Sequence, residues 1–391
     1  MNNGRRPLTF ILVAAFAGFL VYAASHSKGI RQNVARRDSI QYWAGANLLI
    51  NHHNPYDIDK VFELERLQGY EGDRPLVIRT PPWSLFMFLP FGVLSAFWAW
   101  ALWIILSLIC LITAMRSCWN IFAAESGARR VFTLAGYIFA PVPACLVAGQ
   151  MGLLLLLGII LFMKYESRRP FLAGAALILP FAKPHLLALF WLVLLLWIIA
   201  YKKFAVLAGL AAAFVLANLL ALGLDHRVFQ DYRDFLPRAA IAHEFIPAVS
   251  GVIRALFFHR MFWVQFVPLA VALLWSLRYF LKKRETWDWR YHGLILMVVS
   301  VLTTPYAWLS DEVVLLPAIL QATLWIYSSR HTLRIRDRLA IFGFCSLNAL
   351  LLLILYFKIP FSTGIYLWSS LVWFGGYIYA SRFQSPLLER A

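Results

Sequence analysis

The chain has 391 residues, of which 61% are hydrophobic and only 14% are charged. A soluble globular protein carries about a quarter charged residues, so this composition excludes an ordinary soluble domain. The apolar runs are continuous and do not alternate, which excludes the strands of a membrane barrel, and their lengths suit helices that cross a bilayer. We therefore predict an all-α polytopic membrane protein.

Twelve apolar segments follow one another along the chain. The first comes after Arg5 and Arg6 and resembles a secretory signal, but its apolar run is long for one, so we interpret it as an uncleaved anchor. The short apolar segment 82–94 contains two prolines and is interpreted as a re-entrant or interfacial piece. The predicted spans are 8–25, 95–115, 131–148, 150–164, 171–182, 186–201, 204–222, 262–281, 290–307, 312–328, 338–357 and 364–381.

The net charge of +17 is a property that nucleic-acid-binding proteins share. With twelve spans and a cytoplasmic N-terminus, however, most basic residues fall into the cytoplasmic loops and most acidic residues do not. This is the distribution that the positive-inside rule describes. We predict a multi-pass protein of the plasma membrane with both termini in the cytoplasm, and the charge requires no nucleic-acid partner.

The two long polar segments, 26–94 and 223–261, fall on the outer face, whereas the inner loops are short and basic. We therefore expect the functional site on the outer face. The sequence contains no internal repeat and no soluble domain, which predicts one membrane-embedded domain over 1–391. The four cysteines show no CxxC spacing and lie in or beside apolar runs, which favours buried or cytosolic thiols over a disulfide or zinc site.

The first outer segment carries an acid, a helix and a turn in close succession. Asp38 precedes a helix predicted over 39–51, with one apolar face that begins at Tyr42, so this helix is expected on the membrane surface or on the bundle of spans. A turn at 54–57 ends it, because the residue before a proline avoids the helical region. A second helix is predicted over 58–67.

Two interpretations of Asp38 are open. A carboxylate there suits a general base, which takes a proton from a hydroxyl nucleophile within hydrogen-bond reach. Asp38 or Ser39, with Gln41 behind them, also fits the pattern of a helix N-terminal cap. The two roles are compatible with each other.

Two polar breaks interrupt the apolar runs later in the chain. Lys183, Pro184 and His185 divide one run, and a lysine so close to lipid marks a functional site that suits a phosphate. The alternative is a helix-end lysine that extends to the lipid headgroups. Gly149 and Gln150 divide another run, either as a polar break that lines a cavity or as a tight turn.

A third polar group lies at 304–312, between two predicted spans. Asp311 and Glu312 suit a sugar or a cation, or alternatively the N-terminus of a helix, where acids interact well with the helix dipole. Aromatic residues there, Tyr306 among them, suit stacking on a sugar or an interfacial belt. The sequence has no Walker motif, no G-x-G-x-x-G and no G-x-S-x-G, so we expect no nucleotide cofactor. The adjacent His52 and His53 point apart on a helix and no other ligand spacing supports them, so we expect no metal.

These features in this order resemble glycosyltransferase family 87, a family of polyprenol-phosphate-mannose-dependent mannosyltransferases with the GT-C membrane fold. The resemblance reaches from the first outer segment to about Pro317. The motifs that carry it are Asp38 with the helix after it, Asn54-Pro55-Tyr56-Asp57, Pro81-Pro82 with Pro90, Gly149-Gln150, Lys183-Pro184, and Thr304-Pro305-Tyr306 with Ser310-Asp311.

The resemblance implies a GT-C-type bundle of about 12 transmembrane helices, with a long first outer loop that carries short helices. It implies transfer of a hexose, with mannose expected, from a polyprenyl-phosphate sugar to a hydroxyl of a lipid or glycan acceptor, with inversion. Asp38 would be the base, and Lys183 and His185 would stabilise the donor phosphate. The other implied substrate-binding residues are Tyr42, Asn54, Tyr56, Gln150, Tyr306 and Asp311.

Two other functions are compatible with such a chain. One is a multi-spanning transporter or flippase of lipid-linked sugars, in which inverted repeats and polar residues at mid-membrane are common. No repeat is visible here, and the polar candidates gather at the outer ends of spans, which favours the enzyme. The other is a non-catalytic membrane protein of envelope assembly, for which Asp38 would be dispensable.

Overall fold

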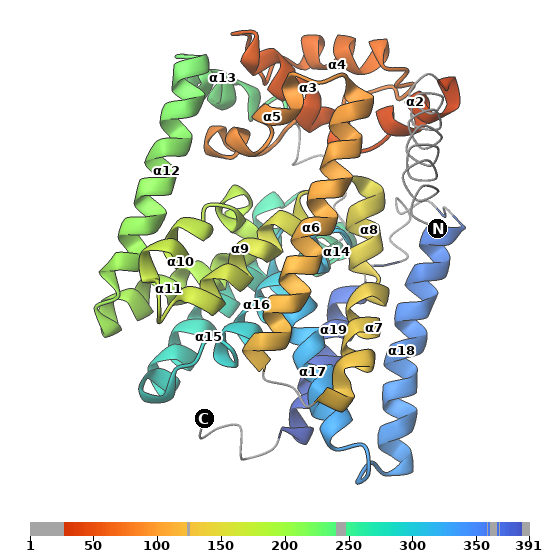
Figure 1. Cartoon of the computed structure of the whole chain (residues 1–391), viewed down its shortest axis with the longest axis vertical. Coiled ribbons are helices and arrows are strands. Elements are labelled where there is room, and N and C mark those ends of the chain that lie inside the picture. The colour runs from red at the N-terminus through yellow and green to blue at the C-terminus, as the bar shows by residue number, and fades with distance from the viewer. Residues whose placement is uncertain are drawn as a thin grey trace, which may run out of the picture. The chain divides into compact units, whose positions relative to one another are not determined.

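The computed structural model describes residues 27–122, 126–239, 248–357, 359, 366 and 368–384. Within these ranges every regular element is an α-helix or a short 3-10 helix, and none is a strand (Figure 1). This confirms the predicted all-α class. The first predicted span, 8–25, lies outside the described residues, as does part of the second outer segment.

The chain forms two compact units. Unit 1 comprises residues 1–105 and 220–239, and unit 2 comprises residues 106–219 and 240–391. The chain passes between the units three times: within the long helices α6 (Ala96–Phe122) and α12 (Phe204–Leu224), and again after Ala239.

Unit 1 contains the short helices of the first outer segment. Two of them match the predicted helices 39–51 and 58–67 closely. The turn between these two helices follows the end of the first and forms the start of the second. The Asp57 side chain accepts hydrogen bonds from the backbone N–H groups of Asp59 and Lys60, at 3.2 Å each, and so caps the second helix. The elements are α2 (Lys28–Ala35), α3 (Ser39–Ile50), α4 (Ile58–Leu67), the 3-10 helix η1 (Pro82–Met87), α5 (Leu89–Gly92), the start of α6, the end of α12 and α13 (Val228–Phe235).

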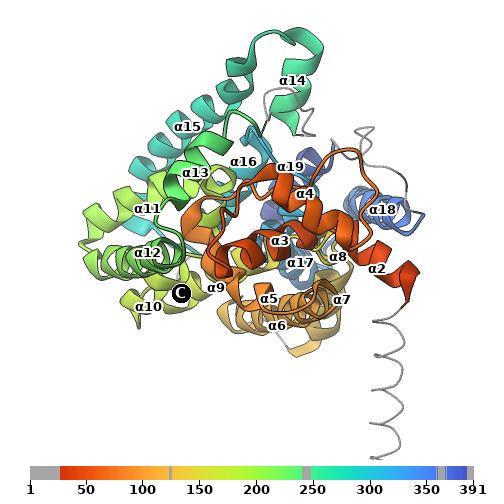
Figure 2. The same cartoon turned by 90° about the horizontal axis from the view of Figure 1, so that it is seen from above.

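Helix α3 is the core of unit 1. It packs against both α4 and α5 (Figure 2), and residues on all its sides are buried. Two side chains fix the segment after α5: Trp43 Nε1 donates to Leu94 O at 2.8 Å, and Asn47 Nδ2 donates to Gly92 O at 2.9 Å. The helix therefore differs from the expected surface helix with one apolar face, because its sequence is apolar nearly all round and such a helix is buried.

The segment 82–94 does not form a spanning helix. It folds into η1 and α5, of six and four residues, and a proline stands in the first turn of each. Both are far shorter than the ~20 residues that cross a bilayer. This agrees with the predicted non-spanning piece.

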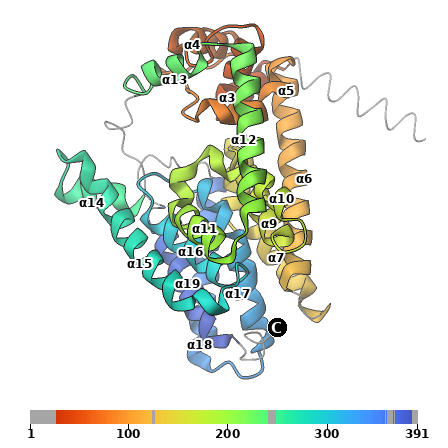
Figure 3. The same ribbon diagram turned by 90° about the vertical axis from the view of Figure 1, so that its left-hand side faces the viewer.

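Unit 2 is a helical bundle in which α16, α17 and α19 pack against one another (Figure 3). Phe162, Phe190, Trp197 and Trp289 form an aromatic cluster within it, with ring centroids 5.0–6.1 Å apart. Besides parts of α6 and α12, its elements are η2 (Ser126–Ala128), α7 (Arg129–Ile138), α8 (Pro141–Ala148), α9 (Gly152–Tyr165), α10 (Pro170–Ala176), η3 (Pro180–Ala182), η4 (Pro184–Leu187), α11 (Ala188–Tyr201), α14 (Val249–Phe257), η6 (Phe262–Phe266), α15 (Val267–Lys283), η7 (Arg284–Thr286), α16 (His292–Thr303), η8 (Asp311–Leu315), α17 (Leu316–Ser328), α18 (Ile335–Tyr356), α19 (Ser369–Ala380) and η10 (Ser381–Phe383).

Several of these helices are long and apolar enough to cross a membrane, which confirms a multi-pass membrane protein. Among the described residues five pass this test, or six if the bent pair α7 and α8 is one span. The predicted number of twelve is not confirmed, because several predicted spans are short helices, α9 and α16 among them. Prolines and polar breaks divide the apolar runs there, so apolar composition alone overestimates helix length. The GT-C-type bundle and the single domain stay predictions.

A buried acid stands inside unit 1. Glu65 of α4 is fully buried, its Oε2 accepts a hydrogen bond from Leu76 N at 3.0 Å, and its Oε1 has no hydrogen-bond partner among the described residues. Burial raises the pKa of the Glu65 carboxyl to about 8, although the hydrogen bond from Leu76 opposes this shift. The folded unit therefore holds the proton to higher pH than the unfolded chain.

Unit 1 should consequently lose stability as the pH rises from about 5 to about 8, the window between the ordinary pKa of Glu65 and its raised value. Local opening of α4, measured by hydrogen exchange corrected for intrinsic rates, should increase at least about tenfold, since one pKa unit corresponds to about 1.4 kcal/mol. Glu65→Gln should remove this increase, whereas Glu63→Gln at an exposed position of α4 should keep it. The same pH dependence in Glu65→Gln would contradict the assignment.

Candidate active site

Three side chains that the sequence singled out separately meet in unit 2. Lys183 Nζ lies 2.7 Å from Asp311 Oδ1 and forms a salt bridge with it. It also donates a hydrogen bond to Gln150 Oε1 at 3.3 Å. The side chains of Lys183 and Asp311 are only 14% and 5% exposed, so the ion pair is largely removed from water. Gln150 and Lys183, each at a break between helices, thus form one polar site with Asp311, which stands at a helix N-terminus.

Gln150 reaches this site because Gly149 ends helix α8. Gly149 has φ of +73°, a left-handed conformation that favours glycine. The N–H groups of Gly149 and Gln150 both bond to Cys145 O, which closes the helix end. The pair therefore forms the predicted tight turn, and Gln150 contacts Lys183. Its role in lining a cavity stays a prediction.

Lys183 stands at a break that Pro184 imposes. The residue before a proline avoids the helical region, and Lys183 has φ −128° and ψ 67°, outside helical values. The chain is helical on either side, in η3 and η4. Because its ammonium group is paired with Asp311, Lys183 does not behave as a helix-end lysine extended towards headgroups.

Asp311 is the first residue of η8, and its two oxygens have different partners. Oδ2 accepts a hydrogen bond from Trp308 N at 3.1 Å, while Oδ1 binds Lys183. Helix α9 approaches this segment closely at Gly152, where an added Cβ would lie 2.8 Å from Ser310 O. A side chain at position 152 would push η8 away from α9. The glycine therefore allows η8 to approach, which brings Asp311 close to the end of α8. The next acid, Glu312, accepts hydrogen bonds from Ser369 Oγ and Trp373 Nε1 and has a structural role.

His185 and Tyr306 form a second pair beside the lysine break. Their rings are 5.7 Å apart in an edge-to-face arrangement. Thr304 Oγ1 donates to His185 O, at 3.1 Å, and also lies 3.2 Å from Tyr306 O, which ties the two segments together. Tyr306 is therefore part of this cluster and does more than contribute to an interfacial belt.

Sequence reasoning missed Arg254. This residue of α14 is 8% exposed, its guanidinium carbon lies 5.4 Å from the centroid of the Phe262 ring, and its charge acts on the Tyr306 hydroxyl. A buried arginine near the cluster suits an anionic ligand. Position 254 lies in the predicted outer segment 223–261, and no local pattern distinguishes it from the many other arginines.

The chemistry that this arrangement supports is anion binding. A lysine ammonium has three N–H donors, and the described contacts to Asp311 and Gln150 use two of them. Asp311 orients the ammonium group, and the low-dielectric surroundings strengthen the attraction of that group for an incoming anion. Among the described residues, no three His, Cys, Asp or Glu side chains are grouped so as to hold a metal ion.

Asp38, the predicted base, belongs to unit 1. It occupies the N-terminal position of α3, but its backbone is already helical and its side chain makes no capping hydrogen bond. The capping interpretation is therefore wrong for this side chain. Asp38 is half-buried, and it interacts electrostatically with Arg37 and Tyr70. Its role as a base stays a prediction.

The other candidates in unit 1 have structural contacts. Tyr42 is buried and stacks on Phe88, with ring centroids 4.4 Å apart. Asn54 Oδ1 accepts a hydrogen bond from Tyr56 N at 2.7 Å, which shapes the turn before α4. The Tyr56 hydroxyl is buried and donates to Thr80 O at 3.0 Å. Contacts of these three residues with a substrate stay predictions.

Fold and site together define a polytopic helical membrane protein that holds a buried lysine–carboxylate pair where helices break. Residues 80–327 match the model of glycosyltransferase family 87, which is more than half of the chain. The chain belongs to glycosyltransferase family 87 and is a membrane glycosyltransferase. The matched region includes the cluster around Lys183, whereas Asp38 precedes it. No curated protein and no solved structure matches the chain.

The buried pair makes a prediction about stability. Lys183→Met should destabilise the protein by about 3–5 kcal/mol, because it leaves the Asp311 carboxylate buried without its counter-charge. The double variant Lys183→Met/Asp311→Leu should recover most of that loss, since it removes both charges. Thermal unfolding in detergent, followed by intrinsic fluorescence, measures both.

The exposed pair Arg36–Glu71 provides the control. Its side chains are 61% and 56% exposed, so Arg36→Met should cost less than about 1 kcal/mol. Equal melting temperatures for the single and double variants at 183 and 311 would show that the two charges do not interact energetically.

Proposed function

We propose that this glycosyltransferase transfers a hexose, with mannose expected, from a polyprenyl-phosphate sugar to an acceptor hydroxyl at the outer face of the plasma membrane. The observation that carries the proposal is the meeting of Lys183, Gln150 and Asp311 within the region that matches the family. A lysine at the start of a candidate span, Pro184–Tyr201, suits a phosphate attached to a membrane lipid.

The donor phosphate is assigned to Lys183, with His185 beside it. During transfer the bond between the anomeric carbon and the phosphate oxygen breaks, so negative charge grows on the phosphate. A lysine that is already paired and oriented by Asp311 stabilises that charge without rearrangement, which is how preorganised groups lower a barrier. Gln150 and Tyr306, on either side of this cluster, are assigned to the donor phosphate and sugar.

Asp38 is assigned as the general base. Its carboxylate takes the proton of the acceptor hydroxyl while that oxygen forms the new bond to the anomeric carbon, and polyprenyl phosphate leaves from the opposite side. The configuration at the anomeric carbon is therefore inverted.

An apolar groove in unit 2 suits the lipid chain of the donor. Its volume is about 990 Å³, near the upper end of the usual range for small-molecule sites, and it lies between η6, α15, α16 and α19. Its lining is aromatic and aliphatic and includes Trp263, Val267, Trp275, Val299 and Thr303. Thr303, which lines the groove, precedes the segment that carries Tyr306.

The predicted topology supports the same side of the membrane. Arg330 and Arg382 lie at the ends of α17 and α19, and the first turn of α7 begins with Arg129. Basic residues collect in cytoplasmic loops, so these ends are assigned to the cytoplasm. Asp311 and Lys183 lie at the opposite ends of their helical segments, which assigns the site to the outer face.

Asp38→Asn should lower sugar transfer by at least about a hundredfold, because an amide cannot accept the proton and general-base catalysis contributes about 10²–10⁴-fold. Binding of the donor should stay within twofold of wild type, roughly the scatter of such measurements, since Asp38 is not assigned to the donor phosphate. The assay uses purified protein with labelled polyprenyl-phosphate sugars and a panel of lipid and glycan acceptors.

The matched control is Asp59→Asn, the same change at an exposed acid of unit 1, which should leave transfer unchanged. Normal turnover by Asp38→Asn would remove the base assignment but keep the enzyme. If wild-type protein transferred no sugar from any polyprenyl-phosphate donor, the donor class itself would be rejected.

A further inference from the structure

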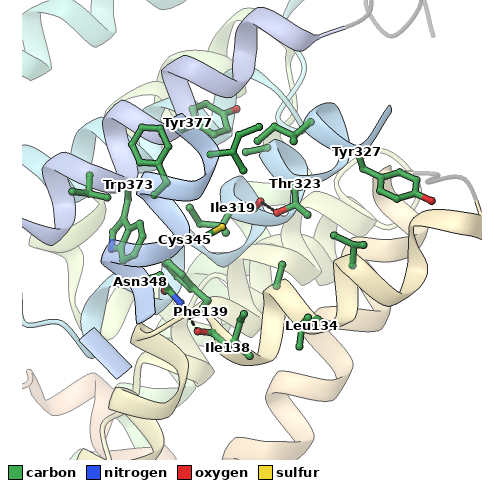
Figure 4. Close-up of a pocket in the computed structure, with 18 of the residues that line it drawn as sticks. Leu134, Ile138, Phe139, Ile319, Thr323, Tyr327, Cys345, Asn348, Trp373 and Tyr377 are labelled. Carbon is green, nitrogen blue, oxygen red and sulfur yellow. Dashed lines mark hydrogen bonds between the residues drawn. The ribbon is translucent and has the colours of Figure 1, made fainter. Parts of the chain in front are cut away.

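A second cavity lies in unit 2, lined by residues outside the candidate active site. It has a volume of about 430 Å³ and lies between α7, α17, α18 and α19. Figure 4 shows Leu134 and Ile138 of α7 on one side, with Thr323 and Tyr327 of α17 and Trp373 of α19 around the space. The lining is almost entirely apolar, and its volume is within the usual range for small-molecule sites.

Hydrogen bonds attach α18 to the neighbouring helices at two points beside the cavity. Asn348 bridges the bend between α7 and α8, since its Nδ2 donates to Ile138 O and its Oδ1 accepts from Ala140 N, both at 2.8 Å. Nearer the start of α18, Asp337 Oδ1 accepts a hydrogen bond from the Tyr379 hydroxyl at 2.6 Å. Between these two contacts, Phe344 lies against α19, with its ring centroid 6.2 Å from that of Tyr379, and other residues of this stretch border the cavity.

Helix α18 is weakly packed for a membrane span. Only 11% of its most apolar window is buried, the lowest share among the five candidate spans of the described residues. Three of its residues between the two contacts, Ile341, Phe344 and Cys345, line the cavity. An apolar slot that borders such a helix is open to the acyl chains of the surrounding bilayer.

One end of the cavity is cationic. Arg330 is exposed, lines the cavity, and lies over the Tyr327 ring with its guanidinium carbon 4.2 Å from the centroid. Its Nη1 donates to Tyr327 O at 3.0 Å, which leaves other guanidinium N–H groups for a ligand. At this end, the helices that border the cavity carry further basic side chains and, among their described residues, one acid, Asp337. The basic residues are Arg129, Arg130, Arg334, Arg336, Arg338 and Arg382.

We propose that this cavity binds one acyl chain of an anionic phospholipid, whose headgroup phosphate is held by Arg330. The apolar slot accepts the chain, and the cationic end favours a negatively charged headgroup over a zwitterionic one. Basic pockets between helices at the cytoplasmic side are suited to anionic lipids, which are concentrated in that leaflet. The lipid completes the packing between α18 and the rest of unit 2 and does not take part in sugar transfer, so this proposal is independent of the donor.

Cys345 provides the probe. It lines the cavity and is exposed, whereas Cys110, Cys118 and Cys145 are buried. The full-length protein is stripped of lipid and placed in nanodiscs of phosphatidylglycerol or of phosphatidylcholine with the same acyl chains. The rate of Cys345 alkylation by a membrane-permeant maleimide is then compared. Phosphatidylglycerol should protect Cys345 more strongly than phosphatidylcholine.

Arg330→Gln should weaken this preference about fivefold, the effect expected for one basic residue close to an anionic lipid. Arg338→Gln is the matched control, because it removes a charge at the same end of the unit but does not line the cavity, and it should keep the preference. Native mass spectrometry should find phosphatidylglycerol retained by wild type and by Arg338→Gln, and less by Arg330→Gln.

A second variant tests the cavity itself. Ala322→Phe places a ring in the slot, so alkylation should no longer depend on the lipid. Equal protection by the two lipids in wild type would overturn the proposal, and so would an unchanged preference in Arg330→Gln. If Ala322→Phe does not fold, Arg330→Gln alone decides the test, because Arg330 is exposed and the protein should tolerate its substitution.

Discussion

The ion pair between Lys183 and Asp311 is the interaction on which the candidate site depends. Two opposite charges are stable inside an apolar unit only if each is the partner of the other and further hydrogen bonds satisfy them. Here Gln150 and the Trp308 amide supply those bonds. The pair in turn requires that the chain stop being helical at Lys183 and just before Asp311, which explains why prolines and glycines lie beside these polar residues.

A buried ion pair does little for stability compared with an apolar contact of the same size, so its presence favours a functional explanation. In a glycosyltransferase, the function that would explain the ion pair is binding of the sugar donor. A soluble transferase that uses a nucleotide sugar binds a diphosphate from water, whereas a lipid-linked donor presents its phosphate at the membrane surface. A preorganised lysine at the start of an apolar helix suits a lipid-linked donor, and the neighbouring apolar groove of about 990 Å³ suits its lipid chain.

The bounds and breaks of several helices could be predicted from the sequence, because neighbouring residues determine them. The bounds of α4 follow from the 54–57 turn and the cap at Asp57, and the breaks at Gly149 and Lys183 follow from glycine and proline chemistry. The pairing of Lys183 with Asp311 could not be derived in this way, since 128 residues separate them and only tertiary packing brings them together. The same holds for Arg254. The predicted number of spans is not confirmed among the described residues, because composition does not show where a run of apolar residues divides into short helices.

The measurement that tests this account most directly is the binding of polyprenyl phosphate, without sugar, to wild-type protein and to Lys183→Gln. The account predicts that Lys183→Gln binds it at least about tenfold more weakly, because a hydrogen bond to a charged group contributes roughly 1.5–3 kcal/mol. Lys282→Gln, a change at an exposed lysine at the end of α15, should bind as wild type does. Equal affinity of wild type and Lys183→Gln, with both proteins folded, would contradict the phosphate site.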